Sequence, residues 1–151
     1  TMETPRLSSL YQQLILEHYR NPRNKAEMDE KTVEIHMANP VCGDEIRLQL
    51  RIEGDQIAEA KFVGQGCSIS QAAISMMTAK IQGASLSDAE GLAERFTALM
   101  HGDTEVAKDR SLGDLRALQG VSKFPVRIKC ALIGFDALQE ALKKHAAEGP
   151  H

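Results

Sequence analysis

The chain has 151 residues, a formal net charge of −3 and three cysteines, with 4 % aromatic residues and no tryptophan. Proteins that mainly bind nucleic acid usually carry a basic face or stacking aromatics, so this composition argues against that class. No apolar run approaches the roughly 18 residues that a membrane-spanning helix requires. The odd number of cysteines, without a secretory signal, favours free or metal-bound thiols in a reducing cytoplasm over a disulfide framework. We expect one domain over residues 1–151.

The first half of the chain predicts one helix followed by three short strands. Apolar residues recur at helical spacing from Leu7 to Ile15, and Asn21-Pro22 ends that helix. Apolar and polar residues then alternate over 33–37, 46–52 and 58–62, which predicts three strands with short connections. Consecutive strands joined in this way form an antiparallel meander.

The second half of the chain predicts helices. Residues 68–82 carry a helical pattern, and Ser87-Asp88-Ala89-Glu90 matches a capping box that opens the next helix. A mainly polar segment over 103–122 contains a short amphipathic piece, and Pro125 suits the first turn of the closing helix. The predicted fold class is therefore α+β, a three-stranded antiparallel sheet with helices packed on one face.

Each of the three cysteines stands where one predicted element gives way to another. They are Cys42 in the turn 39–44, Cys67 ahead of the helix over 68–82, and Cys130 in the first turns of the closing helix. A helix N-terminus and nearby basic residues such as Arg127 and Lys129 favour the thiolate form of a cysteine. Three thiols and the carboxylate of Asp44 are the donor set that a tetrahedral metal site or a sulfur-handling site needs.

Other interpretations of these residues remain open. Any one cysteine also serves as a small buried hydrophobic residue. A cysteine hydrolase would pair Cys42 or Cys67 with His36 or His101, although nothing in the sequence places an imidazole beside a thiol. A structural zinc module would use the same ligands without a nucleophilic cysteine in a mobile turn. On its helix, His18 fits the role of a hydrogen-bonded packing residue better than that of a ligand.

Three motifs occur in order along the chain. They are His18-Tyr19-Arg20-Asn21-Pro22-Arg23-Asn24, Asn39-Pro40-Val41-Cys42-Gly43-Asp44 and Gly66-Cys67-Ser68-Ile69-Ser70. These motifs resemble those of the U-type iron–sulfur assembly family, which includes IscU, the N-terminal part of NifU, and SufU. The resemblance implies the family fold and a pyridoxal-phosphate cysteine desulfurase as partner. It also implies a metal site made from Cys42, Asp44, Cys67 and Cys130.

Within that family the chain is similar to the SufU type. Lys129 stands where IscU-like proteins carry a histidine, and residues 103–122 represent a SufU-type insertion. These features imply a zinc-dependent acceptor that takes sulfur from a SufS-like desulfurase for downstream iron–sulfur assembly proteins. Cys42 would be the nucleophile, Arg127 a supporting residue, and the activity at most that of a sulfurtransferase. The alternative is a scaffold that holds a transient [2Fe–2S] cluster or iron, because thiolate-rich tetrahedral sites suit both uses.

Overall fold

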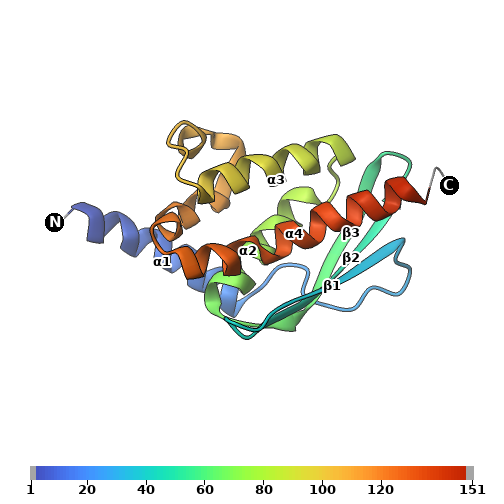
Figure 1. The fold of residues 1–151 in the computed structure, drawn as a ribbon, viewed down its shortest axis with the longest axis horizontal. Helices are drawn as coiled ribbons and strands as arrows, with labels where there is room; N and C mark the ends of the chain where they lie inside the picture. Colours follow the sequence, from blue (N-terminus) through green and yellow to red (C-terminus); the bar gives the residue numbers. More distant parts are fainter. Residues whose placement is uncertain (1–2, 149–151) are drawn as a thin grey trace.

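The computed structural model describes residues 3–148, and describes side chains from Tyr11 onward. The elements in chain order are α1 (Glu3–Arg20), β1 (Val33–Asn39), β2 (Asp44–Glu53), β3 (Gln56–Gln65), α2 (Ser68–Ile81), α3 (Leu86–Met100), the 3₁₀ segments η1 (Val106–Lys108) and η2 (Arg110–Lys123), and α4 (Pro125–Ala147). Helices α2 and α4 pack side by side on the sheet, and α3 packs on α4 as a further layer (Figure 1). The predicted fold class is confirmed.

The sheet is an antiparallel meander in the order β1-β2-β3. Apolar side chains of β2 alternate toward the helices and are fully buried; they are Ile46, Leu48 and Leu50. Because successive side chains of a strand point to opposite faces, the residues between them face away from the helices. Gln49 is the buried exception on that opposite face, where its Oε1 accepts a hydrogen bond of 2.7 Å from the backbone N–H of Met28.

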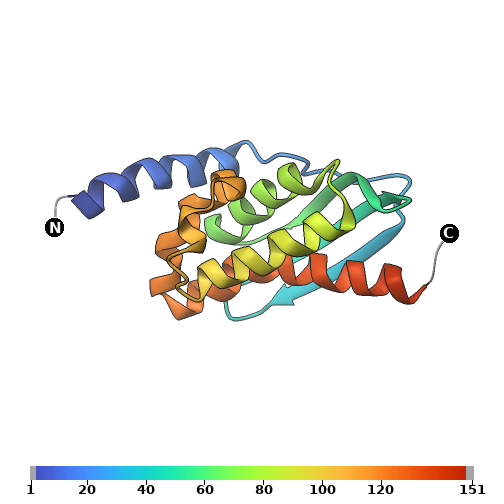
Figure 2. The same ribbon diagram turned by 90° about the horizontal axis from the view of Figure 1, so that it is seen from above.

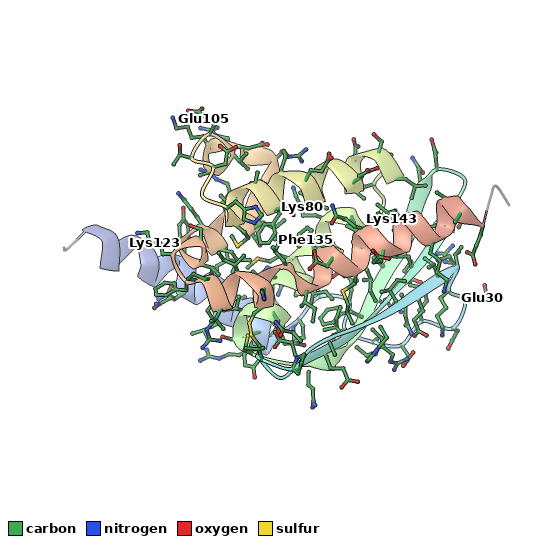
Figure 3. All side chains as sticks on the ribbon, in the orientation of Figure 1. Glu30, Lys80, Glu105, Lys123, Phe135 and Lys143 are labelled. Atoms are coloured by element: carbon green, nitrogen blue, oxygen red, sulfur yellow. A yellow bond between two sulfur atoms is a disulfide. The ribbon has the colours of Figure 1, made fainter. Side chains whose placement is uncertain are left out.

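Helix α2 lies at the centre of the molecule. Ten of its 14 residues are buried, as expected for a helix packed on several sides. Gly134 of α4 lets the two helices approach closely, because a Cβ there would lie 3.1 Å from the Cβ of Ile74. The next residue of α4, Phe135, points inward and stacks on Phe96 of α3 with ring centroids 4.4 Å apart (Figure 3). These contacts fix the position of α4 over the sheet.

The start of α3 differs from the sequence prediction. The capping box predicted at Ser87 is wrong: the N-cap is Ser85, whose hydroxyl accepts a hydrogen bond of 3.0 Å from the N–H of Asp88. The reason is a long-range contact, because Leu86 N–H donates to the carbonyl of Asp55 in the β2–β3 turn at 2.8 Å. This bond holds the chain extended at Ser85, so the helix begins directly after it.

The segment over 103–122 folds mainly as η1 and η2. The predicted amphipathic piece is confirmed, since its apolar residues Leu112, Leu115, Leu118 and Val121 are buried. The ring of His18 joins this segment to two helices, with Nδ1 2.8 Å from Ser75 Oγ on α2 and Nε2 2.9 Å from Asp114 Oδ2 on η2. The packing role of His18 is therefore confirmed. That this segment is an insertion, and that residues 1–151 form one domain, stay predictions.

The first and last helices of the chain reach opposite ends of the molecule (Figure 2). Helix α1 projects from one end, and the C-terminal half of α4 reaches the other end (Figure 2). Among residues 3–148, no helix has the length and apolar character that crossing a membrane requires.

Candidate metal and sulfur-transfer site

Three segments far apart in the sequence meet at one end of the sheet. They are the β1–β2 turn, the start of α2 and the start of α4 (Figure 1). Each segment carries one cysteine, and Asp44 is the first residue of β2. One ligand atom from each of Cys42, Asp44 and Cys130 lies within 4.8 Å of the other two. The structure therefore brings three of the four predicted ligands into one group.

The turn that carries Cys42 is built by Asn39. Its carbonyl accepts a hydrogen bond from the Cys42 N–H at 3.2 Å, and its side-chain oxygen accepts one from the Val41 N–H at 3.2 Å. The side-chain amide of Asn39 also lies 3.6 Å from Cys42 Sγ. Gly43 follows with φ of 70°, a conformation that favours glycine. Cys42 is half-buried, so its sulfur is within reach of solvent.

Asn39 was missed as a functional residue in the sequence analysis. An asparagine before proline signals a turn in which the side chain bonds the backbone two residues on, as it does here. That signal predicts the turn. The approach of the amide to the sulfur depends on the fold.

Asp44 is a buried carboxylate with one oxygen bonded and the other without a partner. The residue is 2 % exposed, and Oδ1 accepts hydrogen bonds of 3.0 Å from the Cys67 N–H and from the Ser70 hydroxyl. Within the described part of the chain, Oδ2 is buried and has no hydrogen-bond partner. Buried carboxylate oxygens are normally bonded, so a free one in a carboxylate grouped with two sulfurs is an open ligand position.

Cys67 is the N-cap of α2, as predicted. Its sulfur accepts a hydrogen bond from the Ser70 N–H at 3.5 Å, and its thiol is free and half-buried. Its backbone N–H reaches Asp44, but its sulfur lies outside the group formed with Cys42 and Cys130. Ser70 was missed in the sequence analysis, although its position three residues after a helix N-cap is one that caps commonly bond.

Cys130 lies fully buried in α4 and is joined to Cys42 by a disulfide with a Cα–Cα distance of 6.6 Å. The expectation of free thiols is wrong for this pair, which is oxidised in the structure, and it holds for Cys67. Metal binding by Cys42 and Cys130 stays a prediction for the reduced protein. The physical reason is convergence, because the turn and the first turns of α4 bring both sulfurs to one point. They lie 3.8 Å and 3.7 Å from the carbonyl oxygen of Val126. A cysteine count carries no such distance information.

Arg127 lies on the exposed first turn of α4, beside this group. It lines a cavity of about 430 Å³ together with residues of α1, α2 and η2. Its side chain makes no hydrogen bond or ion pair with any described residue. Phe124 and Val126 on the same turn are 61 % and 58 % exposed, so the start of α4 presents apolar and basic side chains to solvent.

The histidines named for a hydrolase lie elsewhere. Nε2 of His36 bonds Glu45 at 3.0 Å on an exposed surface, and His101 caps the end of α3. Among the residues that the structure describes, no histidine belongs to the group of Cys42, Asp44 and Cys130. The imidazole base that a cysteine hydrolase needs is therefore not part of this group.

Residues 10–148 match the family described as "NifU-like N terminal domain". The chain belongs to this iron–sulfur cluster assembly family. A similar relative is "Zinc-dependent sulfurtransferase SufU" of Bacillus subtilis, 47 % identical over 138 residues that cover 91 % of this chain and 92 % of the relative. "Iron-sulfur cluster assembly scaffold protein IscU" of Streptococcus pyogenes is 37 % identical, with 96 % and 90 % covered.

A solved structure agrees with these relatives. It is a proposed iron–sulfur cluster assembly scaffold protein for the SUF system from Fervidobacterium islandicum. It superimposes with a TM-score of 0.78 at 29 % identity, over 85 % of this chain and 93 % of that chain. The family resemblance predicted from three short motifs is thereby confirmed over most of the chain.

Proposed function

We propose that this protein is a zinc-dependent sulfur acceptor and carrier for iron–sulfur cluster biogenesis in the cytoplasm. It takes persulfide sulfur from a SufS-like, pyridoxal-phosphate-dependent cysteine desulfurase and supplies it to downstream iron–sulfur assembly proteins. The observation that carries the proposal is one accessible sulfur, on Cys42, grouped with the buried ligands Asp44 and Cys130. The printed name of the Bacillus relative, which states zinc dependence and sulfur transfer, supports it.

The donor set fits zinc. Thiolates and carboxylates are common zinc ligands, and Asp44, grouped with two sulfurs, has an oxygen without a hydrogen-bond partner among the described residues. We assign Cys42, Asp44, Cys67 and Cys130 as the ligands. Bound zinc supplies positive charge that keeps its cysteine ligands in the thiolate form.

Sulfur acceptance is assigned to Cys42 because of where it lies. It sits in a turn between two strands, so it moves without unwinding a helix, whereas Cys67 and Cys130 lie at helix starts. The Cys42 thiolate attacks the terminal sulfur of the desulfurase persulfide, and the desulfurase cysteine leaves as a thiolate. The Asn39 amide, 3.6 Å from this sulfur, is placed to donate a hydrogen bond to it. Arg127, at the exposed start of α4, is assigned to docking or to stabilising the thiolate.

The second candidate is a scaffold that assembles a transient [2Fe–2S] cluster on the same four ligands. The Streptococcus relative named as a scaffold favours it. Metal analysis of anaerobically purified protein separates the two candidates. We expect a colourless protein with about one zinc per chain. A brown protein with about two irons per chain and acid-labile sulfide would favour the scaffold, since thiolate sites suit both metals.

The assignment of Cys42 is tested with a SufS-like desulfurase and cysteine as sulfur source. We expect Cys42→Ala to carry no persulfide and to lose stimulation of sulfide release. Asp44→Ala is the matched control, because a carboxylate is not a nucleophile: it should alter metal retention while Cys42 still gains sulfur. Mass spectrometry after digestion locates the sulfur. Sulfur found mainly on Cys67 or Cys130 would overturn the assignment, and none on any cysteine would overturn the proposed function. A structural zinc module would also leave Cys42 unmodified.

A further inference from the structure

The three cysteines are not equivalent in the structure. Cys42 is half-buried, Cys130 is 0 % exposed, and their sulfurs are bonded to each other. The sulfur of Cys67 is free, bonds the Ser70 N–H of its own helix, and lies outside the group of ligand atoms. The fold thus gives the accessible cysteine one buried cysteine within bonding reach.

We propose that Cys130 is a resolving cysteine that discharges the sulfur carried by Cys42 as sulfide. The inference rests on the proposed function, since it starts from a persulfide on Cys42. Cys130 attacks the inner sulfur of that persulfide, which is Cys42 Sγ itself. Written in full, Cys42–S–S–H plus Cys130–S–H gives Cys42–S–S–Cys130 plus H₂S. The terminal sulfur takes the bonding electron pair and leaves as sulfide, and the two cysteines supply the two electrons.

The inner sulfur is the target because the structure shows Cys130 bonded to that atom. Both sulfurs also lie close to the carbonyl oxygen of Val126, at 3.8 Å for Cys42 and 3.7 Å for Cys130, so the start of α4 holds them together. The leaving sulfide departs from the partly exposed side of the pair, while the attacking sulfur stays buried. Exchange depends on access to the attacked sulfur, and this arrangement gives it.

The product is a disulfide, which a dithiol reductant must open before another cycle. Because Cys130 is buried and Cys42 is not, the external thiolate attacks Cys42 Sγ, and Cys130 leaves as the thiolate. The reductant becomes oxidised, and both cysteines return to the reduced form. The external reductant thus reduces the Cys42–Cys130 disulfide after sulfide has left, and it does not reduce the persulfide directly.

The experiment begins with a persulfide made without any partner protein. The full chain is reduced with dithiothreitol, desalted under anaerobic conditions and loaded with one equivalent of inorganic polysulfide, both as purified and after chelation. A second anaerobic desalting then removes unreacted polysulfide and the sulfide that loading itself releases. Sulfide release is then followed without reductant, and digestion without reduction maps the disulfide. We expect sulfide and the Cys42–Cys130 disulfide to appear together in equal amounts in at least one of the two samples. Without an oxidant, sulfane sulfur is the only electron acceptor in this reaction.

Cys130→Ser should keep its sulfur on Cys42. Its rate of sulfide release should be lower than the wild-type rate by a factor of about ten or more. Gly91→Ala in α3, outside the assigned ligands, is the control, and it should release sulfide at the wild-type rate. An unchanged rate in Cys130→Ser, a disulfide to Cys67, or sulfur transferred to Cys130 as a persulfide would each overturn the proposal. If Cys130→Ser does not fold, the disulfide map of the wild-type chain decides alone. A desulfurase can also load Cys42 with sulfur. If that Cys42 persulfide never yields the Cys42–Cys130 disulfide, this inference is overturned and the proposed function stays intact.

Discussion

Replacing Gly66 by alanine tests the hydrogen bonds that fix the carboxylate of Asp44, because the added Cβ would collide with the groups that form them. A Cβ at this position would lie 2.4 Å from Asp44 Oδ1 and 2.6 Å from Ser70 Oγ. Both distances are too short, so the carboxylate, the hydroxyl or the backbone must move. The hydrogen bonds at risk are those that Oδ1 accepts from the Cys67 N–H and from Ser70, each 3.0 Å long.

The expected loss follows from those two hydrogen bonds. Hydrogen bonds to a charged group contribute roughly 1.5–3 kcal/mol each, and a shifted carboxylate weakens both without abolishing them, so Gly66→Ala should lower the free energy of unfolding by about 2–4 kcal/mol. Replacing glycine by alanine also stabilises through the unfolded chain, but by only about 0.4–1 kcal/mol. The steric effect therefore dominates. For a chain of this length, the melting temperature should fall by about 5–15 °C.

Thermal unfolding followed by circular dichroism measures this loss, and Gly91→Ala is the matched control. Gly91 lies inside α3, where a Cβ would meet only the Nη1 atom at the end of the Arg95 side chain, 3.4 Å away. Alanine there should stabilise the helix by roughly 0.5–1 kcal/mol, so the two variants should shift in opposite directions. If the melting temperature of Gly66→Ala equals that of the wild type, Asp44 is not fixed by Cys67 and Ser70 as described.

Two further predictions concern the metal and pH. Removing zinc with a chelator under reducing conditions should lower the melting temperature, because the ion links three segments; identical melting of stripped and loaded protein would contradict the proposed site. Hydrogen bonds from Ser111, with the charge of Arg95 nearby, hold the pKa of Asp109 below its ordinary value of 3.8. Its carboxylate therefore stabilises the fold above about pH 4, and this contribution is lost as pH falls through the lower folded pKa. Asp109→Ala should melt below the wild type at pH 7, with a difference that shrinks in acid; a constant difference would refute this.

The fold could be predicted because its signals are local. The predicted strand over 46–52 lies within the observed Asp44–Glu53. It could be predicted because the alternation of apolar and polar residues, which buries one face of a strand, is visible in the sequence itself. The cap of α3 was misplaced for the opposite reason. Two serines, Ser85 and Ser87, both stand before a helical pattern, and the choice between them depends on a backbone bond to Asp55. No feature of the local sequence contains that contact.

The site was only partly predictable. A turn and two helix starts could be assigned to the three cysteines from the sequence, and the family resemblance supplied their convergence. Spacing alone does not show that Cys130 reaches Cys42 while the sulfur of Cys67 stays with its own helix. The role of Ser70 is also set by distance rather than by pattern, because its hydroxyl bonds Asp44 only after β2 and α2 have packed. The amide of Asn39 approaches Cys42 Sγ within a single turn, through the conformation of that turn.

The choice of a carboxylate at position 44 has a physical reason in this geometry. A carboxylate has two oxygens that accept hydrogen bonds or bind a metal independently. In Asp44, Oδ1 links the start of β2 to the N-terminus of α2, because it accepts hydrogen bonds from the Cys67 N–H and the Ser70 hydroxyl. Oδ2 has no hydrogen-bond partner among the described residues, in a carboxylate that is grouped with the sulfurs of Cys42 and Cys130. A cysteine at this position would offer a single sulfur for both tasks. Asp44 therefore sets the position of the Cys67 helix relative to the Cys42 turn and remains available as a ligand.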